Sequence, residues 1–240
     1  MSFSFEPIGV IHSCFKEKFG VPRQPGLVKS ARAELELFPP YNRAEAWAGV
    51  EAYSHLWINF VFHQCIRDEP NLTVRPPRLG GNQKLGVFAT RATFRPNPLG
   101  LSVVALERVE NVADKITLHL GGVDLVEGTP VLDVKPYIPY VDSIPQASAG
   151  FAQTAPGREF EVVFSEEARA ELAHHGQRWP ELAQLIEEVI SLDPRPAYFK
   201  RSERDKPFAM RLFDLKIRWR IEGAVAVVTG IHPDQPVEDH

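Results

Sequence analysis

Residues 86–106 of this chain read GVFATRATFRPNPLGLSVVAL. Both flanks alternate apolar and small residues, as β-strands do, whereas the middle holds two arginines, an asparagine and two prolines. Each proline fixes φ and removes a backbone donor, so residues 95–98 are predicted to form a stiff, non-helical loop. Such a loop either holds polar side chains at strand ends for a binding site or is simply a well-made turn, and this stretch alone favours neither.

The strand pattern extends on both sides of this stretch through residues 1–150. Short runs rich in Val, Ile, Leu and aromatic residues are separated by connectors that contain Pro and Gly, and only residues 42–51 have the pattern of a helix. Many short strands at near-regular spacing favour a closed or nearly closed antiparallel barrel. The chain lacks the βαβ alternation and the G-x-G-x-x-G turn of a dinucleotide-binding domain, and Gly80–Gly81 is predicted to be a plain turn.

A second unit is predicted after the small polar residues of 143–157, which have the composition of a linker. There Ser165 has the position of a helix N-cap and Gly176 that of a helix stop. Residues 211–221 and 224–231 are predicted to pair as a hairpin. The predicted fold is therefore a mainly β domain (1–150), a single-sheet antiparallel barrel, followed by a small α+β domain (151–240) that is large enough to carry its own core.

The overall composition is ordinary for a soluble globular protein, with 44% hydrophobic and 24% charged residues. No run approaches the ~18–20 apolar residues of a membrane span. The N-terminus carries Glu6 and no basic segment, so a secretory signal is not predicted. The two cysteines, Cys14 and Cys65, have no metal-ligand spacing. We therefore expect a reduced, cytoplasmic protein without a metal site.

The net charge of −4 argues against a nucleic-acid partner, but the distribution of charge argues for an anionic one. Residues 70–106 contain five Lys and Arg residues and no acid, and residues 195–220 contain nine against three acids, with aromatic residues between them. Two basic zones in an acidic chain indicate an anion bound on one face. Chance clustering on a solvated surface is the alternative.

Polar residues gather in three loops of the predicted barrel domain, at 21–30, 90–100 and 124–140. In the third loop, Asp133 and Lys135 point the same way if 130–135 is a strand. They are either site residues or an internal ion pair that closes a barrel end. His63 and Gln64 follow an apolar strand, where ligand sites gather, although a lone histidine is more often structural.

Six blocks occur in order along the chain: PRQPGLVKS, SHLW…FVFHQ, RPPRLGG, GVFATRATFRPNPLGLS, DLVEGTPVLDVKPY and DPRPAY. Together they resemble the family of tRNA adenine-37 N6-methyltransferases, the TsaA-like or TrmO family, in its longer bacterial form. The resemblance implies a single-sheet β-barrel methyltransferase that uses S-adenosylmethionine and acts as a homodimer. It also implies N6-methylation of threonylcarbamoyl-adenosine at position 37 of threonine tRNA, beside the anticodon that reads ACY codons.

The resemblance also implies cofactor contacts at the strand-end loops. These are Arg23, Gln24, Pro25, Gly26, Leu27, His63, Gln64, Arg91, Leu101, Asp124, Leu125, Val126, Glu127 and Gly128. In this interpretation Arg91 clamps the cofactor carboxylate, and backbone groups near Gly26 and Gly128 bind its adenine and amino-acid ends.

The candidates for the reaction itself are Asn97, Asp133, Lys135 and Tyr137. Asn97 or Asp133 would accept the N6 proton, Arg95 or Lys135 would pair with the threonyl carboxylate, and Tyr137 would stack on the base. In the basic stretch 195–220, the residues assigned to the phosphates of the anticodon arm are Lys200, Arg201 and Arg204. Charge reversal at any of these three is expected to weaken tRNA binding and lower its salt dependence.

Two other functions fit the same residues. A non-catalytic nucleic-acid-binding barrel would use the basic loops without a cofactor, and cofactor binding separates it from an enzyme. A methyltransferase of the same fold with another substrate would differ only in its product.

Overall fold

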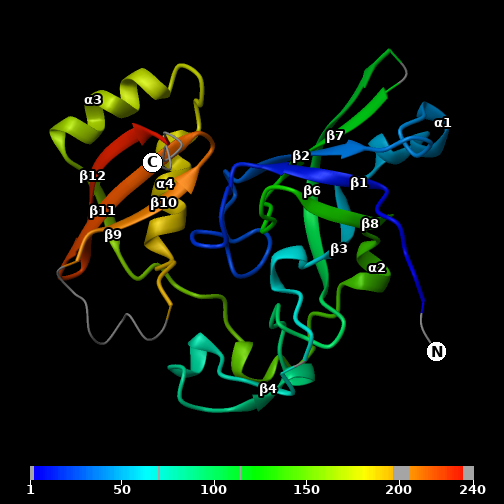
Figure 1. The fold of residues 1–240 in the computed structure, drawn as a ribbon, viewed down its shortest axis with the longest axis horizontal. Helices are drawn as coiled ribbons and strands as arrows, with labels where there is room; N and C mark the ends of the chain where they lie inside the picture. Colours follow the sequence, from blue (N-terminus) through cyan, green and yellow to red (C-terminus); the bar gives the residue numbers. More distant parts are fainter. Residues whose placement is uncertain (1–2, 70, 114, 197–205, 235–240) are drawn as a thin grey trace.

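The computed structural model describes residues 3–69, 71–113, 115–196 and 206–234, and a closed six-stranded antiparallel barrel forms its larger part (Figure 1). The strands follow the spatial order β1-β2-β7-β6-β3-β8. Their bounds are β1 Gly9–Ser13, β2 Arg32–Leu37, β3 His55–Val61, β6 Leu99–Val112, β7 Lys115–Gly121 and β8 Thr129–Pro136. The predicted mainly β barrel is confirmed.

Strand β3 shows how the sequence pattern builds this barrel. Its alternate residues Leu56, Ile58 and Phe60 are buried inside, so the residues between them face outward. Opposite Phe60 on β6 lies Gly100, where an added Cβ atom would fall 2.1 Å from the Phe60 ring. Because β3 and β6 are paired neighbours, their outward side chains lie together on the outer face of the barrel.

Short elements connect these strands. They are α1 Ala44–Trp47, the strand pair β4 Thr73–Val74 and β5 Leu85–Gly86, α2 Pro139–Asp142, and 3-10 helices at Val50–Ala52, His63–Cys65, Pro77–Leu79, Val87–Ala89 and Gly150–Ala152. The helix predicted over 42–51 is therefore split into α1 and a 3-10 turn. Gly80 and Gly81 both have positive φ and form the plain turn that was predicted.

The prediction of a strand before the 90–100 loop is wrong for the residues after Gly86. Residues 87–89 instead form a 3-10 turn, since the hydroxyl of Thr90 donates to the carbonyl of Val87 at 2.8 Å and the backbone N–H of Thr90 donates to it at 3.2 Å. Val87 is buried, whereas Phe88 is exposed. The alternation of apolar and small residues at 87–89 therefore comes from a 3-10 turn with one buried residue, Val87, and not from a β-strand.

A four-stranded sheet and two helices form the C-terminal part. The sheet order is β10-β11-β12-β9, with β9 Glu161–Phe164 parallel to β12 Val225–Pro233, and β10 Phe208–Leu212 and β11 Leu215–Glu222 antiparallel. Helix α3 Glu166–His175 begins at Ser165, whose hydroxyl accepts a hydrogen bond from the Ala168 N–H. The predicted N-cap and the β11–β12 hairpin are confirmed, and α4 spans Leu182–Ser191.

One predicted strand of this hairpin is divided in the structure. Residues 211–221 contain a tight turn at Phe213, whose φ of 53° ends β10 and allows β11 to fold back on it. The Phe213 ring stacks on Trp179 with 3.9 Å between ring centroids. This stacking holds an aromatic residue at a turn, where sequence patterns favour Gly, Asn or Asp.

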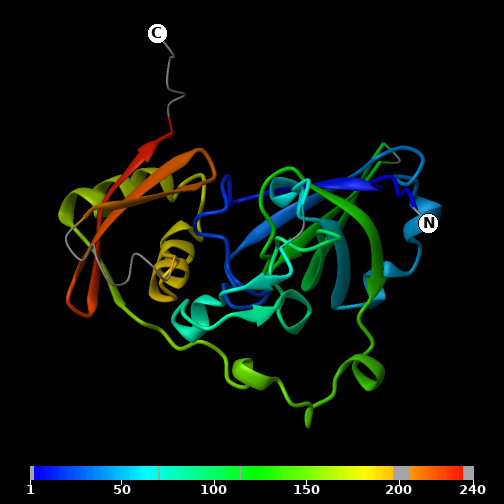
Figure 2. The same cartoon turned by 60° about the horizontal axis from the view of Figure 1, so that its bottom comes forward.

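The two parts share a hydrophobic core. Buried side chains from the barrel and the four-stranded sheet form one continuous cluster, so the small sheet packs against the barrel. Phe15, after β1, forms a β-bridge with Leu212 at the end of β10, and Phe213 donates its N–H to Cys14. Helix α4 lies between the sheet and the loop after β1, while residues 143–160 run along the outside (Figure 2).

Within the described ranges, no helix has both the length and the apolar character needed to cross a membrane.

Candidate active site

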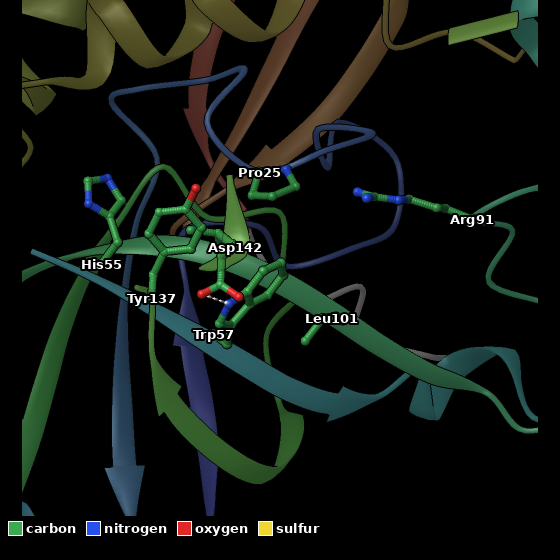
Figure 3. A pocket seen from close by; sticks show the side chains of 8 residues that line it. Pro25, His55, Trp57, Arg91, Leu101, Tyr137 and Asp142 are labelled. Carbon is green, nitrogen blue, oxygen red and sulfur yellow. Dashed lines mark hydrogen bonds between the residues drawn. The ribbon is translucent and has the colours of Figure 1, made fainter. Parts of the chain in front are cut away.

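A hollow of about 450 Å³ lies on the outward face of β3 and β6 (Figure 3). Its lining residues are Pro25, His55, Trp57, Arg91, Leu101, Val103, Tyr137 and Asp142. Trp57 on β3 is paired across the ladder with Val103 on β6, and both side chains face outward. Arg91 and Pro25 come from loops around this face and Asp142 from α2, so the hollow joins segments far apart in the sequence.

The 21–30 and 90–100 loops meet at this hollow. Arg91 donates through Nη1 to the side-chain oxygen of Gln24 at 2.6 Å. Arg95 donates to the carbonyls of Thr90 and Ala92 at 3.2 and 3.4 Å, which braces its own loop. The 90–100 loop thus places Arg91 beside two predicted cofactor residues, Gln24 and Pro25.

Asp124, at the start of the third loop, is a buried carboxyl group next to these loops. Ser102 on β6 donates its hydroxyl to Oδ1 of Asp124 at 2.6 Å. Burial raises the Asp124 pKa from 3.8 to about 6, against the opposing effects of the Ser102 hydrogen bond and the Arg91 charge. Asp124 therefore exchanges a proton close to physiological pH.

Glu127, further along the third loop, attaches this loop to β1 and to the residues that follow β1. Its carboxylate accepts hydrogen bonds from the Ser13 N–H at 2.7 Å and the Lys16 ammonium at 2.8 Å, and it contacts His12 at 3.0 Å. Burial alone would raise the pKa of Glu127, but the bonds from Lys16 and His12 lower it overall. The predicted cofactor residue Glu127 thus has its carboxylate engaged by the barrel itself.

Two backbone donors predicted for the cofactor are also used within the fold. The Gly26 N–H donates to the Gly122 carbonyl at 2.8 Å, and the Gly128 N–H donates to the Ile11 carbonyl at 2.9 Å. These two N–H groups are therefore occupied within the fold, and cofactor contacts from other backbone groups near Gly26 and Gly128 stay a prediction. A Cβ atom at Gly128 would lie 4.0 Å from Nε2 of His63, whose pKa is lowered by burial, so a neutral imidazole lies beside this loop.

The predicted reaction residues divide into two groups. Tyr137 lines the hollow, whereas Asn97 is an exposed residue of its loop. Asp133 and Lys135 form an ion pair with side chains 50% and 66% exposed, on the outward face beside the hollow but not lining it. Because the pair is exposed, it is not the internal ion pair that was the alternative interpretation.

Four lining residues were missed by sequence reasoning: His55, Trp57, Val103 and Asp142. The Trp57 indole N–H and the Ile138 backbone N–H both donate to Oδ2 of Asp142, at 3.0 and 2.8 Å. The two bonds lower the pKa of Asp142, with the larger effect from the Ile138 N–H. Asp142 is therefore a carboxylate at neutral pH. The available signal was the strand alternation of β3, which turns Trp57 outward.

The basic stretch 195–220 is not uniformly exposed. Arg195 is buried and forms an ion pair with Asp193, so it is not available to a phosphate. Lys216, Arg218 and Arg220 alternate along β11 on the face opposite its buried residues, and Arg218 and Arg220 are exposed. Lys200, Arg201 and Arg204 lie outside the described residues.

Among the described residues, no group of three or more His, Cys, Asp or Glu side chains could hold a metal ion.

Comparison with known families identifies the chain. The family model of the tRNA-methyltransferase O N-terminal domain matches residues 10–143, and that of the TrmO C-terminal domain matches residues 157–234. The chain belongs to the TrmO family. The resemblance inferred from the six sequence blocks is confirmed.

Individual relatives cover this TrmO chain almost completely. The Escherichia coli K12 protein named tRNA (adenine(37)-N6)-methyltransferase is 54% identical over 232 residues, which are 97% of this chain and 99% of the relative. A Pseudomonas aeruginosa PAO1 protein, provisionally named as an S-adenosylmethionine-dependent methyltransferase, is 52% identical over 91% of this chain and 93% of its own. A crystal structure of TrmO from P. aeruginosa superposes with a TM-score of 0.80 at 43% identity, covering 97% of this chain and 98% of that one.

The raised pKa of Asp124 predicts how the stability of this TrmO chain depends on pH. The folded state holds the Asp124 proton more tightly than the unfolded state, so the free energy of unfolding falls as pH rises from about 4 to 6. One pKa unit equals about 1.4 kcal/mol, so the ionised carboxylate costs on the order of 3 kcal/mol at pH 7.

Asp124→Asn is therefore expected to stabilise the chain at pH 7 and to flatten the change between pH 4 and 6. Denaturant unfolding at pH 5 and pH 7.5 measures both effects, with Asp68→Asn, at an exposed site, as the control. Unchanged stability of Asp124→Asn at pH 7.5 would contradict the assignment.

Proposed function

We propose that this chain is an S-adenosylmethionine-dependent methyltransferase that acts on N6 of adenine-37 in tRNA. We further propose that its acceptor is threonylcarbamoyl-adenosine in the threonine tRNA that reads ACY codons. The observation that carries the proposal is the hollow in which Arg91, Pro25 and Leu101 meet, since all three are cofactor residues implied by the family. The name of the E. coli relative supports N6-methylation of adenine-37 in tRNA, and the name of the P. aeruginosa relative supports the cofactor.

The residues present fit the cofactor. Ligand pockets are typically about 300–1,000 Å³, mostly apolar with a few polar groups, and the hollow at about 450 Å³ has Pro25, Leu101 and Val103 beside the Arg91 cation. When bound, S-adenosylmethionine supplies a methyl group on a positively charged sulfur, which departs as a neutral thioether.

The protein's own contribution is binding and alignment. Arg91, oriented by Gln24, would hold the cofactor carboxylate, and the Asp124 carboxylate would lie near its positive charge. Aligning the acceptor nitrogen with the methyl carbon is worth up to ~7–11 kcal/mol of the activation free energy of the reaction. Of the sequence-derived reaction candidates, Tyr137 lines the hollow, which supports the proposal that it stacks on the acceptor base. Arg95, Asn97, Asp133 and Lys135 remain predictions for the threonyl and proton contacts.

We propose that residues 1–150 bind the cofactor and that residues 151–240 hold the tRNA. The stripe of Lys216, Arg218 and Arg220 on β11 supports the second assignment, because alternate basic residues on one strand face present charge to a phosphate backbone. Lys200, Arg201 and Arg204, which lie outside the described residues, are proposed to contact the tRNA phosphates as well. We propose a cytoplasmic location as well, because the proposed substrate is a tRNA.

A homodimer is part of the proposal. Exposed apolar side chains lie on β6 and on the segment after β8, and one of them, Leu101, lines the hollow: Leu99, Leu101, Tyr140, Val141 and Ile144. Exposed apolar patches of this kind mark interaction surfaces, and a second copy of the chain would cover them. Sedimentation or light scattering of the purified protein would measure the association.

Product analysis tests the function directly. The purified protein would be incubated with S-adenosylmethionine and threonine tRNA that either carries or lacks the threonylcarbamoyl group. We expect mass spectrometry of the nucleosides to show one added methyl on the modified adenosine and none on the unmodified tRNA. Methylation of both tRNAs would remove the proposed acceptor, and cofactor or tRNA binding without any product would favour a non-catalytic barrel.

A further inference from the structure

The hollow has two chemically different sides. Arg91 lies on one side, and His55, Trp57, Tyr137 and Asp142 gather on the other (Figure 3). The Arg91 side contains residues that the family resemblance assigns to the cofactor. No residue of the opposite side except Tyr137 has been given a role, so this side is available for the second reactant.

Asp142 is held in a specific orientation on this side. The Trp57 indole N–H and the Ile138 backbone N–H donate to the same oxygen, Oδ2, at 3.0 and 2.8 Å. Neither donor uses the other oxygen, Oδ1. Two converging donors therefore fix the carboxylate plane and leave Oδ1 as an acceptor beside the hollow.

Aromatic rings surround this carboxylate. The rings of Trp57 and Tyr137 are 6.0 Å apart between centroids and tilted by 48°, and those of His55 and Tyr137 are 6.4 Å apart. Proteins bind unstacked bases on such aromatic surfaces and read their edges with neighbouring polar groups. An aromatic wall with a fixed acceptor is suited to a planar ring that carries an N–H donor.

We propose that the Trp57–Tyr137 side of the hollow binds the acceptor adenine and that Oδ1 of Asp142 accepts the N6 proton. This inference rests on the proposed function and names the residue that takes the proton in it. The N6 lone pair forms the new bond to the methyl carbon, the carbon–sulfur bond breaks, and sulfur keeps its electron pair. The N6–H proton passes to Asp142 and then to solvent, so charge and atoms balance.

Asp142 meets this requirement better than Asp133, the carboxylate favoured by the sequence. Asp133 is neutralised by the adjacent Lys135 ammonium and does not line the hollow. Asp142 lines it, and both of its hydrogen bonds come from neutral N–H donors that leave the negative charge uncompensated. A carboxylate that is already ionised can accept a proton as the nitrogen becomes acidic during transfer.

Asp142→Asn is the decisive variant. The asparagine oxygen can still accept from Trp57 and Ile138, so the fold is retained, but an NH₂ donor then replaces the free acceptor oxygen. We expect kcat for tRNA methylation to fall about 100-fold or more, as loss of a general base typically does. Calorimetry should show S-adenosylmethionine affinity within about twofold of wild type, because Asp142 is assigned to the other reactant.

Two further variants serve as controls. Glu51→Gln, the same change at an exposed position of the 3-10 turn at Val50–Ala52, should leave kcat unchanged. Trp57→Phe keeps a ring but removes one donor to Asp142, so it should lower kcat less than Asp142→Asn without changing cofactor affinity.

The outcomes separate this inference from the proposed function. Unchanged kcat in Asp142→Asn, or lost cofactor affinity with normal folding, would overturn the role of Asp142 while wild-type methylation still supported the function. A wild-type protein that binds cofactor and tRNA yet methylates no tRNA would overturn both.

Discussion

Replacing Arg91 with alanine is expected to weaken S-adenosylmethionine binding about 10- to 100-fold. Hydrogen bonds to charged groups contribute about 1.5–3 kcal/mol, and each 1.4 kcal/mol changes a dissociation constant about tenfold. Arg91 lines the hollow and is oriented by Gln24, so its guanidinium is placed in advance for a carboxylate. Isothermal titration calorimetry of wild type and variant measures the change.

The expected loss depends on the shape of the guanidinium as well as on its charge. Arg91→Lys retains the charge but not the planar pair of donors, so it should lie between wild type and Arg91→Ala. Arg75→Ala removes another arginine, one that donates to the Asn82 carbonyl away from the hollow, and should leave affinity unchanged. Equal affinities for all four proteins would show that Arg91 does not contact the cofactor. Because Arg91 is exposed, its removal should cost little folding stability.

The barrel was predictable because its strands obey a local rule. The alternation of buried and outward residues in β3 and β8 can be read from neighbouring residues alone, and so can the N-cap at Ser165. The turn at Phe213 was not predictable, since its left-handed backbone is stabilised by stacking on Trp179, far away in sequence. The 3-10 turn at Val87–Ala89 was missed because its pattern is too short to distinguish from a strand.

The candidate site was predictable only in part, for a similar reason. The 90–100 loop, which contains Arg91 and the stiff segment 95–98, can be recognised in the sequence by its prolines and arginines. Asp142 becomes recognisable only when β3 brings Trp57 to it, across 85 positions of sequence. In the sequence, nothing distinguishes Trp57 from the other apolar residues of its strand, and nothing distinguishes Asp142 from the other acidic residues of the chain. The alternation of residues along a strand predicts which side chains face outward, but it does not specify which strands become neighbours. A site on the outward face of a barrel depends on those neighbours.

Arg195 shows how a charge pattern misleads when burial is unknown. It was counted with the basic residues expected to hold tRNA, yet its side chain is 8% exposed and that of Asp193 is 2% exposed. The Nε and Nη2 atoms of Arg195 donate to the two oxygens of Asp193 at 2.7 and 3.1 Å. Its guanidinium also lies over the rings of Phe160 and Phe208, 5.3 and 5.4 Å from their centroids. Arg195 is thus part of the interior between β9, β10 and α4.

Arg195→Met is accordingly expected to destabilise the protein by about 3–5 kcal/mol, because it leaves a buried carboxylate without its guanidinium partner. Denaturant unfolding monitored by tryptophan fluorescence measures this, since Trp219 is buried in the same core. The double variant Asp193→Asn/Arg195→Met should recover much of the loss, because it removes the buried negative charge of Asp193 together with the guanidinium charge that balances it. A double variant as unstable as the single one would show that packing of the arginine, rather than pairing, is what matters.

The same variant separates stability from function. Arg23 of the 21–30 loop donates to the backbone carbonyl of Arg195 at 3.3 Å, and substitution of the side chain leaves that carbonyl in place. Folded Arg195→Met protein should therefore bind S-adenosylmethionine with nearly wild-type affinity at low temperature. A loss of affinity in the folded variant would instead mean that the buried pair fixes the loop around Gln24, and through Gln24 the position of Arg91.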